Sequence, residues 1–226
     1  MIEEPSFTGG HWVWRDRRGP VEVAFVGRGP AGERDEVLRR IEPDAPEVAW
    51  AKQVHSARAL PSRSGFCGEG DALFTSRTGL ALSVVTADCV PILLAGPGGL
   101  AAVHAGWRGI ADGVVAATLA ELEGPLQEWT AWIGPAIGPC CYEVGEEVAE
   151  RIVAASGPEV ATAGPSGKPH LDLQETVRRQ LAAAGVGEVE IVRRCTRCDE
   201  ETLWSYRREG KGAGRNLAFI WRTSPS

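Results

Sequence analysis

Three side chains that can bind metals lie at or near the downstream ends of extended apolar segments. His55 ends the run QVH, Cys89 lies in TADC between two apolar runs, and His104 lies in AVHAG. In a sheet, strand ends are where such side chains leave the core and meet in one crevice. Two imidazoles and a thiolate suit Zn2+, and three ligands leave one position for water or substrate. The spacing predicts an open zinc site; the alternative is core histidines and an inert thiol.

Polar neighbours of these residues add to this prediction. Asp88 is embedded in an apolar run, and an unpaired buried carboxylate is costly, so we expect it to be exposed at a strand end, hydrogen-bonded or neutralised. A carboxylate that orients a ligand or carries a proton fits this requirement. After His104, the stretch GWRG predicts a tight turn at a helix start. Backbone N–H groups and Arg108 there can hold an oxyanion such as phosphate. The alternative is a glycine turn with a solvated arginine.

The remaining histidines and clustered cysteines carry weaker signals. Cys195 and Cys198 form a C-x-x-C pair, which is typical of a redox site or of half a structural zinc site. There is no second such pair, and the adjacent residues Cys140 and Cys141 normally point in different directions. We therefore expect these cysteines to pack in turns and shape a pocket wall. His11 and His170 are expected on the surface or in packing.

Strand and helix patterns interleave along the chain. Strands are predicted at residues 21–27, 47–55, 71–75, 80–96 on both sides of TADC, 99–107, 129–134, 189–194 and 216–222, and residues 61–70 are predicted as a loop. A short charged helix is predicted before residue 43, and further helices at residues 110–122, 145–156 and 171–185. The fold class is therefore mixed α/β (α+β): one domain, residues 1–226, with a mixed sheet flanked by helices.

Composition narrows the range of partners. The chain has 226 residues, is 43% hydrophobic and carries a net charge of −6, which disfavours nucleic acid and anionic membranes. No stretch is typical of a signal peptide or a membrane helix, so we expect a cytoplasmic protein. Six cysteines in such a chain favour thiols or metal ligands over disulfides. The sequence does not predict the oligomeric state.

Five motifs, in order, resemble the YfiH-like or laccase-domain family. They are KQVH at 52–55, TADC at 86–89, HAGWRG at 104–109, IGPCCYEVG at 137–145 and CTRCDEETLWSYRREGKGAGR at 195–215. Members are described as purine nucleoside phosphorylases with adenosine deaminase activity and carry an older label of multicopper polyphenol oxidase. The resemblance spans roughly residues 47–222. It implies a YfiH-like fold, with His55, Cys89 and His104 as zinc ligands.

The resemblance also implies a purine nucleoside and phosphate as partners. Phosphorolysis needs groups that bind the anion, and deamination needs a carboxylate that moves protons. The candidates for anion binding and catalysis are Arg28, Arg108, Arg207 and Arg208, those for proton transfer are Asp88 and Glu143, and those for stacking on the base are Trp107, Trp204 and Tyr206. The family's early TTR-x-GGVS loop is much shortened here, and Arg28 is the one plausible match to its arginine.

The sequence is also compatible with three other functions. A metal-independent hydrolase would use Cys89 as nucleophile and a histidine as its base. A copper polyphenol oxidase needs about ten histidines, and this chain has four, so copper is expected only as an adventitious replacement for zinc. A scaffold protein that keeps the fold without activity is the non-enzymatic alternative.

Overall fold

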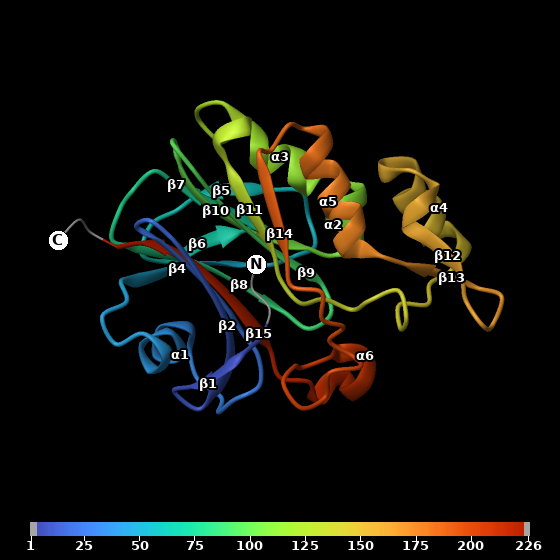
Figure 1. Ribbon diagram of the computed structural model, residues 1–226, viewed down its shortest axis with the longest axis horizontal. Helices are drawn as coiled ribbons and strands as arrows, with labels where there is room; N and C mark the ends of the chain where they lie inside the picture. The colour runs from blue at the N-terminus through green and yellow to red at the C-terminus, as the bar shows by residue number, and fades with distance from the viewer. Residues whose placement is uncertain (1–3, 224–226) are drawn as a thin grey trace.

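The computed structural model describes residues 4–223, which form two mixed β-sheets that face each other (Figure 1). In spatial order, the seven-stranded sheet contains β1 (Ser6–Thr8), β2 (His11–Arg18), β3 (Val21–Val26), β15 (Asn216–Arg222), β8 (Leu80–Thr86), β4 (Glu47–Lys52) and β6 (Gly65–Glu69). The six-stranded sheet contains β14 (Glu188–Ile191), β11 (Thr130–Ile133), β9 (Val90–Gly96), β10 (Gly99–Ala105), β7 (Ala72–Thr75) and β5 (Ala59–Pro61).

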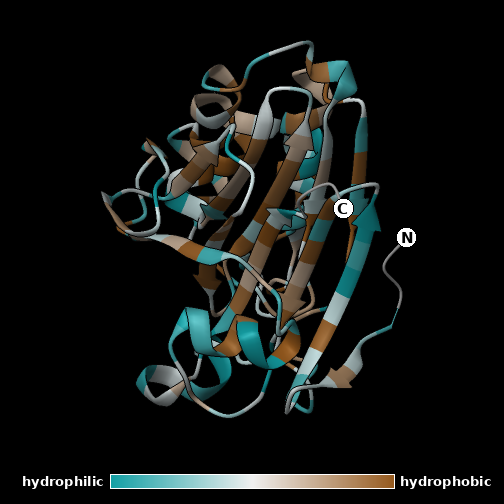
Figure 2. Ribbon diagram, turned by 90° about the vertical axis from the view of Figure 1, so that its left-hand side faces the viewer, coloured by the Kyte–Doolittle hydropathy of each residue, from teal (hydrophilic) through white to brown (hydrophobic). Residues whose placement is uncertain are grey.

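One layer of the apolar core lies between these sheets, and two others lie between a sheet and its helices. Phe25 and Leu82 from the seven-stranded sheet and Leu93 and Trp132 from the six-stranded sheet belong to one buried cluster. Figure 2 shows the hydrophobic residues concentrated along the central strands. Strands buried on both faces read as continuous apolar runs, which explains why β8, β9 and β10 were predictable from the sequence. The single predicted sheet is in fact two, while the mixed α/β class is confirmed.

Helices cover the outer face of each sheet (Figure 1). Helix α1 (Arg34–Ile41) packs on the seven-stranded sheet. The six-stranded sheet is covered by α2 (Trp107–Ala111), α3 (Val114–Ala120), α4 (Glu146–Ser156) and α5 (Leu173–Ala183). A two-stranded sheet of β12 (Ala161–Ala163) and β13 (Pro169–Leu171), the short helix α6 (Tyr206–Glu209) and three 3-10 turns, Leu126–Glu128, Pro158–Val160 and Gly210–Gly212, complete the chain.

Two predicted elements differ from the structure. The single helix predicted at residues 110–122 is divided into α2 and α3, because Gly113 adopts a left-handed conformation with φ of 88°. The loop predicted at residues 61–70 contains β6, which pairs in parallel with β4. Within residues 4–223, the helices are all too short or too polar to cross a membrane. The extent of the domain, residues 1–226, stays a prediction.

Candidate metal centre

Strand ends from both sheets meet at one edge of the molecule. Strands β4 and β8 run in parallel, so both end at this edge, and His55 and Cys89 follow them. In the other sheet, β9 and β10 are antiparallel, and His104 near the end of β10 pairs with Pro91 near the start of β9. The segment after β4 is fastened to β8 by Gln53, whose side chain exchanges two hydrogen bonds with the backbone of Val85.

The three predicted ligands are brought together at this edge, in what is called below the His–Cys–His centre. One ligand atom from each of His55, Cys89 and His104 lies within 4.8 Å of the others. The distance from Cys89 Sγ to His55 Nε2 is 3.9 Å, and the two imidazole rings are nearly perpendicular, with centroids 4.9 Å apart. His55 is exposed and His104 is buried, so the centre opens on one side.

Asp71, which the sequence analysis did not single out, organises this centre from behind. Its buried carboxylate accepts a hydrogen bond of 2.8 Å from His104 Nδ1. It also accepts the backbone N–H groups of Val54, His55 and Ser56 and the hydroxyl of Ser56. One carboxylate therefore fixes the His104 ring and the loop that carries His55. The available signal was a lone acid at the start of the strand DALFT, directly after GEG.

Backbone geometry at the centre is specific. His55 and Asp88 are the non-glycine residues with positive φ in residues 4–223, at 60° and 91°, a conformation that is uncommon and clusters at functional sites. Gly106 follows His104 closely, and a Cβ atom there would lie 2.8 Å from His55 Cδ2 and 3.1 Å from Cys89 Sγ. The centre therefore requires a glycine at position 106.

The ionisation of Asp71, Cys89 and His104 is coupled by their contacts. Burial raises the pKa of Cys89, but hydrogen bonds from His104 and His55 outweigh it and lower that pKa to about 6. Burial lowers the pKa of His104, but its bonds to Asp71 and Cys89 raise that pKa to about 9. Burial also opposes ionisation of Asp71, yet the bonds from His104 and Ser56 hold its pKa well below the usual value. Without a metal, these contacts favour a thiolate on Cys89 beside an imidazolium on His104.

The donor set fits a zinc ion. Zinc bonds to nitrogen and sulfur of about 2.0–2.3 Å place tetrahedral ligands roughly 3.3–3.8 Å apart, close to the separation of Cys89 and His55. Because His104 gives Nδ1 to Asp71, its Nε2 is left for the metal, and a ligand histidine characteristically donates its other N–H to a carboxylate. Cys89 presents a thiolate, the form that binds metals.

Asp88 is held beside the centre by the C-terminal part of the chain. Its carboxylate accepts the Thr196 hydroxyl at 2.6 Å and the backbone N–H of Arg207 at 2.6 Å. Its backbone carbonyl accepts the N–H of Ile137 at 3.0 Å. Of the three environments expected for this carboxylate, the structure therefore shows the hydrogen-bonded one. Its contacts fix the turn that ends at Cys89.

Tyr142 and two of the predicted arginines lie around the same centre. Burial, then the charge of Cys89, raises the pKa of Tyr142 to about 12, while Arg207 and Arg108 act against this rise. The Arg207 guanidinium lies 5.3 Å from the Tyr142 ring centroid and donates to the Glu143 carbonyl at 3.0 Å. Tyr142 therefore presents a protonated hydroxyl; its sequence signal, one tyrosine after two cysteines, was not used.

Trp107 and Glu143 engage in contacts of their own. Arg108 and Arg151 lie over the Trp107 ring at 4.6 and 5.3 Å. The Glu143 carboxylate accepts the Ser166 hydroxyl at 2.6 Å and pairs with Lys168. These bonds tie Glu143 to the loop between β12 and β13.

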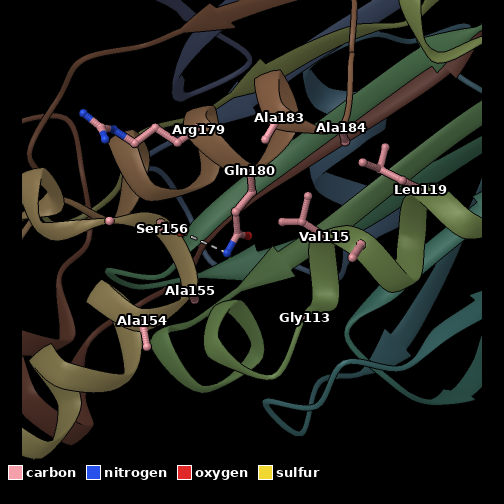
Figure 3. Close-up of a pocket in the computed structure, with 12 residues that line it drawn as sticks. Gly113, Val115, Leu119, Ala154, Ala155, Ser156, Arg179, Gln180, Ala183 and Ala184 are labelled. Carbon is pink, nitrogen blue, oxygen red and sulfur yellow. Dashed lines mark hydrogen bonds between the residues drawn. The ribbon is translucent and has the colours of Figure 1, made fainter.

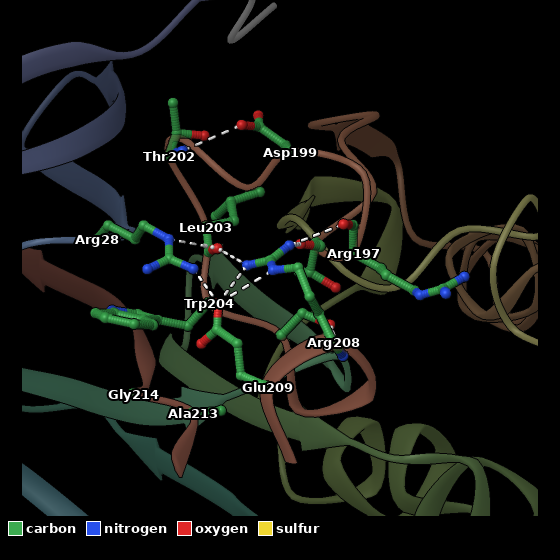
Figure 4. Close-up of polar contacts among 12 residues, drawn as sticks. Arg28, Arg197, Asp199, Thr202, Leu203, Trp204, Arg208, Glu209, Ala213 and Gly214 are labelled. Carbon is green, nitrogen blue, oxygen red and sulfur yellow. Dashed lines mark hydrogen bonds and ion pairs between the residues drawn. The ribbon is translucent and has the colours of Figure 1, made fainter.

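Arg28 and Arg208 are held in a polar network that Figure 4 shows. Arg28 donates to the Leu203 carbonyl at 3.0 Å, pairs with Glu209 and lies 3.9 Å from the Trp204 ring centroid. Arg208 donates to the carbonyls of Thr196, Arg197 and Leu203 and also pairs with Glu209. These contacts brace the segment that ends in α6, where Tyr206 is exposed.

The clustered cysteines differ from the expectation of simple turn packing. The sulfur atoms of Cys140, Cys141, Cys195 and Cys198 lie within 4.8 Å of one another. The turn that begins at Gly138 brings adjacent side chains to one point, contrary to the expectation that they diverge. His11 and His170 are buried and bonded to backbone carbonyls, as packing residues are.

The cavity shown in Figure 3 lies elsewhere, among α3, α4 and α5. It measures about 600 Å3 and is lined mainly by small residues such as Gly113, Ala154 and Ala183. One hydrogen bond, from Gln180 to Ser156, crosses it. Its lining includes no residue of the His–Cys–His centre, so this cavity is separate from the candidate metal site.

Several known proteins are similar to this chain in sequence or in fold. The model of a family described as "Multi-copper polyphenol oxidoreductase laccase" matches residues 31–223. "Purine nucleoside phosphorylase YfiH" of Escherichia coli is 38% identical over 76% of this chain and 72% of its own length. "Purine nucleoside phosphorylase YlmD" of Geobacillus stearothermophilus is 40% identical over 92% of this chain and 86% of its own length. The crystal structure of the Neisseria meningitidis protein NMB0706 has a TM-score of 0.83 at 29% identity, covering 95% of this chain and all of that one.

Proposed function

Because this chain belongs to the multi-copper polyphenol oxidoreductase laccase family, whose similar members are named purine nucleoside phosphorylases, we propose that it is a zinc-dependent purine nucleoside phosphorylase with adenosine deaminase activity. The observation that carries the proposal is the convergence of His55, Cys89 and His104 in front of the Asp71 carboxylate.

In this proposal the zinc ligands are His55, Cys89 Sγ and His104 Nε2. A zinc ion held by these three residues would supply Lewis-acid polarisation of a reactant. Asp71 keeps His104 in the tautomer that presents Nε2, and it holds the His55 loop through three backbone N–H groups. The protein thus sets the ligands before a metal arrives.

Arg108 and Arg207 are proposed to bind the anionic phosphate. The charges of both arginines lower the pKa of Tyr142, and the charge of Cys89 raises it. Both arginines therefore lie near the same centre. Guanidinium groups suit phosphate because their N–H donors form paired hydrogen bonds with its oxygens. Arg28 and Arg208, whose donors are engaged with carbonyls and Glu209, are proposed to position the α6 segment instead.

Proton transfer is proposed to involve Asp88 or Glu143, with Tyr142 as a hydrogen-bond donor. Deamination needs a group that accepts and returns a proton beside the purine. Asp88 is the nearer to Cys89 in the chain, but its two hydrogen bonds suit a positioning role. Trp107 is proposed to form one wall of the substrate site.

One observation favours a second candidate, a metal-independent cysteine hydrolase. The Cys89 thiolate beside the His104 imidazolium is the arrangement of a cysteine nucleophile with its base. For the copper alternative, the four histidines of the chain fall short of the roughly ten that a multicopper oxidase uses. Copper bound at these ligands would be a replacement for zinc.

The test replaces Cys89 by alanine, with Cys67→Ser as the matched control because Cys67 lies outside both groups of clustered ligands. We expect Cys89→Ala to lose zinc from this centre and at least a thousandfold of nucleoside turnover, while Cys67→Ser keeps both. Full turnover after complete zinc removal would favour the hydrolase candidate. Full turnover in Cys89→Ala would refute both.

A further inference from the structure

A second group of sulfur ligands lies outside the His–Cys–His centre. Cys198 Sγ is 3.3 Å from Cys141 Sγ and 3.6 Å from Cys140 Sγ, and with Cys195 all four sulfurs lie within 4.8 Å of one another. Four zinc–sulfur bonds of about 2.3 Å place tetrahedral sulfurs roughly 3.8 Å apart, whereas a disulfide needs about 2.05 Å. We propose that these four residues, the four-cysteine cluster, bind a structural zinc ion.

The backbone builds this cluster from two segments far apart in the sequence. Ala136 forms a parallel bridge with Cys195, and the N–H of Thr196 donates to the Ala136 carbonyl at 3.0 Å. In the first segment, the N–H groups of Cys141 and Tyr142 both donate to the Gly138 carbonyl. This tight turn is what directs two consecutive cysteines to one point.

The second segment has the form of a metal-binding C-x-x-C loop. The N–H of Asp199 donates to the Cys195 carbonyl at 3.0 Å and closes the loop. The Cys195 sulfur accepts the Gly138 N–H at 3.2 Å, and the N–H groups of Arg197 and Cys198 also donate to it. Backbone donors aimed at a sulfur stabilise its thiolate form, which is the form that binds zinc.

Four protein ligands would leave no position for a reactant, so the role is structural. The cluster joins the segments that hold Asp88: Ile137 donates to its carbonyl and Thr196 to its carboxylate. Asp88 directly precedes Cys89. A zinc ion in the cluster would therefore fasten the wall of the His–Cys–His centre without touching a substrate.

The test separates the two sites by mutation and measures zinc released on denaturation. We expect two zinc ions per chain in the wild type and in Cys67→Ser, one in Cys89→Ala, one in Cys198→Ser and none in the Cys89→Ala, Cys198→Ser double variant. Cys140→Ser, which should match Cys198→Ser, serves if that variant does not fold. Zinc content unchanged by Cys198→Ser and Cys140→Ser, or lost entirely with Cys89→Ala, would overturn the inference.

Two further readouts address the chemistry of the ligands. Cobalt added to metal-free Cys89→Ala should give the intense sulfur-to-cobalt absorption of a tetrahedral thiolate site, and its absence would overturn the inference. Thiol titration of the denatured, unreduced wild type after zinc removal should find all six cysteines. A count of four free thiols would mean that two cysteines form a disulfide, which would show a redox pair instead. If the His–Cys–His centre alone lacked zinc, the cluster would still hold its ion in both Cys89→Ala and the wild type.

Discussion

At the scale of single residues, the candidate site depends on Asp71, a buried carboxylate that orients the side chains around it. Asp71 binds the His104 ring and three successive backbone N–H groups around His55, so one buried carboxylate positions two of the proposed ligands. The convergence of His55, Cys89 and His104 could be predicted because each lies at or near the downstream end of an extended apolar segment. Asp71 could not, because its partners lie 15 to 33 residues away in the chain and meet it only after folding.

The space at Gly106 gives a prediction with a closely matched control. Gly106 and Gly145 both precede helices with nearly the same backbone angles, φ of −77° and −78°. A Cβ atom added at Gly106 would press on His55 and Cys89. A Cβ atom added at Gly145 would have no neighbouring atom within 4 Å. We expect Gly106→Ala to weaken zinc affinity about 10–100-fold, measured by competition with a chelator, and Gly145→Ala to leave it unchanged. Equal affinities in the two variants would contradict this geometry.

Zinc affinity at the centre should depend on pH in a defined direction. Zinc binds a neutral imidazole and a thiolate, so it competes with protons. Between about pH 6 and 9 the Cys89 thiol is ionised and His104 is protonated in the metal-free protein. Affinity should therefore rise about tenfold per pH unit in this window, and more steeply below about pH 6, where Cys89 must also lose a proton.

The measurement is competition with an indicator calibrated at each pH, made in the Cys198→Ser variant so that only this centre is observed. The slope should flatten above about pH 9, where His104 is already neutral. A flat profile from pH 6 to 9 would show that His104 is not a ligand.

At the scale of elements, helix ends and turns place the ligands. Helix α5 begins at an N-cap, Asp172, which accepts the Glu175 N–H at 2.8 Å. Glu175 then pairs with Arg178, Arg179 and Arg193, which lies two residues before Cys195. The start of this helix therefore anchors the segment between β14 and the four-cysteine cluster.

Glu175 should make stability sensitive to acid. The bond from Arg178 and those from Arg179 and Arg193 outweigh burial and lower its pKa to about 2. A depressed pKa stabilises the fold above the unfolded value, near 4.5, and this stability is lost as the pH falls toward 2. Since the arginines are partly exposed, we expect about 1 kcal/mol.

Urea unfolding at pH 6 and pH 3 measures this contribution. Glu175→Gln should lower the free energy of unfolding at pH 6 and reduce its change between the two pH values. Glu147→Gln, at an exposed position in the first turn of α4, is the control. An unchanged difference in Glu175→Gln would show that these ion pairs do not contribute to stability.

The elements also mark where sequence patterns stop being informative. Apolar runs predicted β8, β9 and β10 because burial on both faces leaves a continuous signal. Strand β6, with sequence GFCGE, was missed because its glycines read as a loop and its pairing with β4 is tertiary. The same limit applies to Cys140 and Cys141. The directions of their side chains depend on a turn that the neighbouring residue types do not specify.

At the scale of the whole molecule, the fold places its chemistry where the edges of two sheets meet. β4 and β8 from one sheet and β7, β9 and β10 from the other contribute their ends to this edge. The buried layer between the sheets gives these ends a rigid base, as binding sites require. The chain closes the arrangement when residues 195–207 return to hold Asp88.

Product analysis of adenosine incubated with the zinc-loaded protein, with and without phosphate, decides whether this chain is a purine nucleoside phosphorylase with deaminase activity. We expect free adenine and a sugar phosphate when phosphate is present, inosine and ammonia from water in either case, and none of these products in His104→Ala. Full zinc occupancy with no product from adenosine, inosine or guanosine, or equal turnover in His104→Ala, would contradict this expectation.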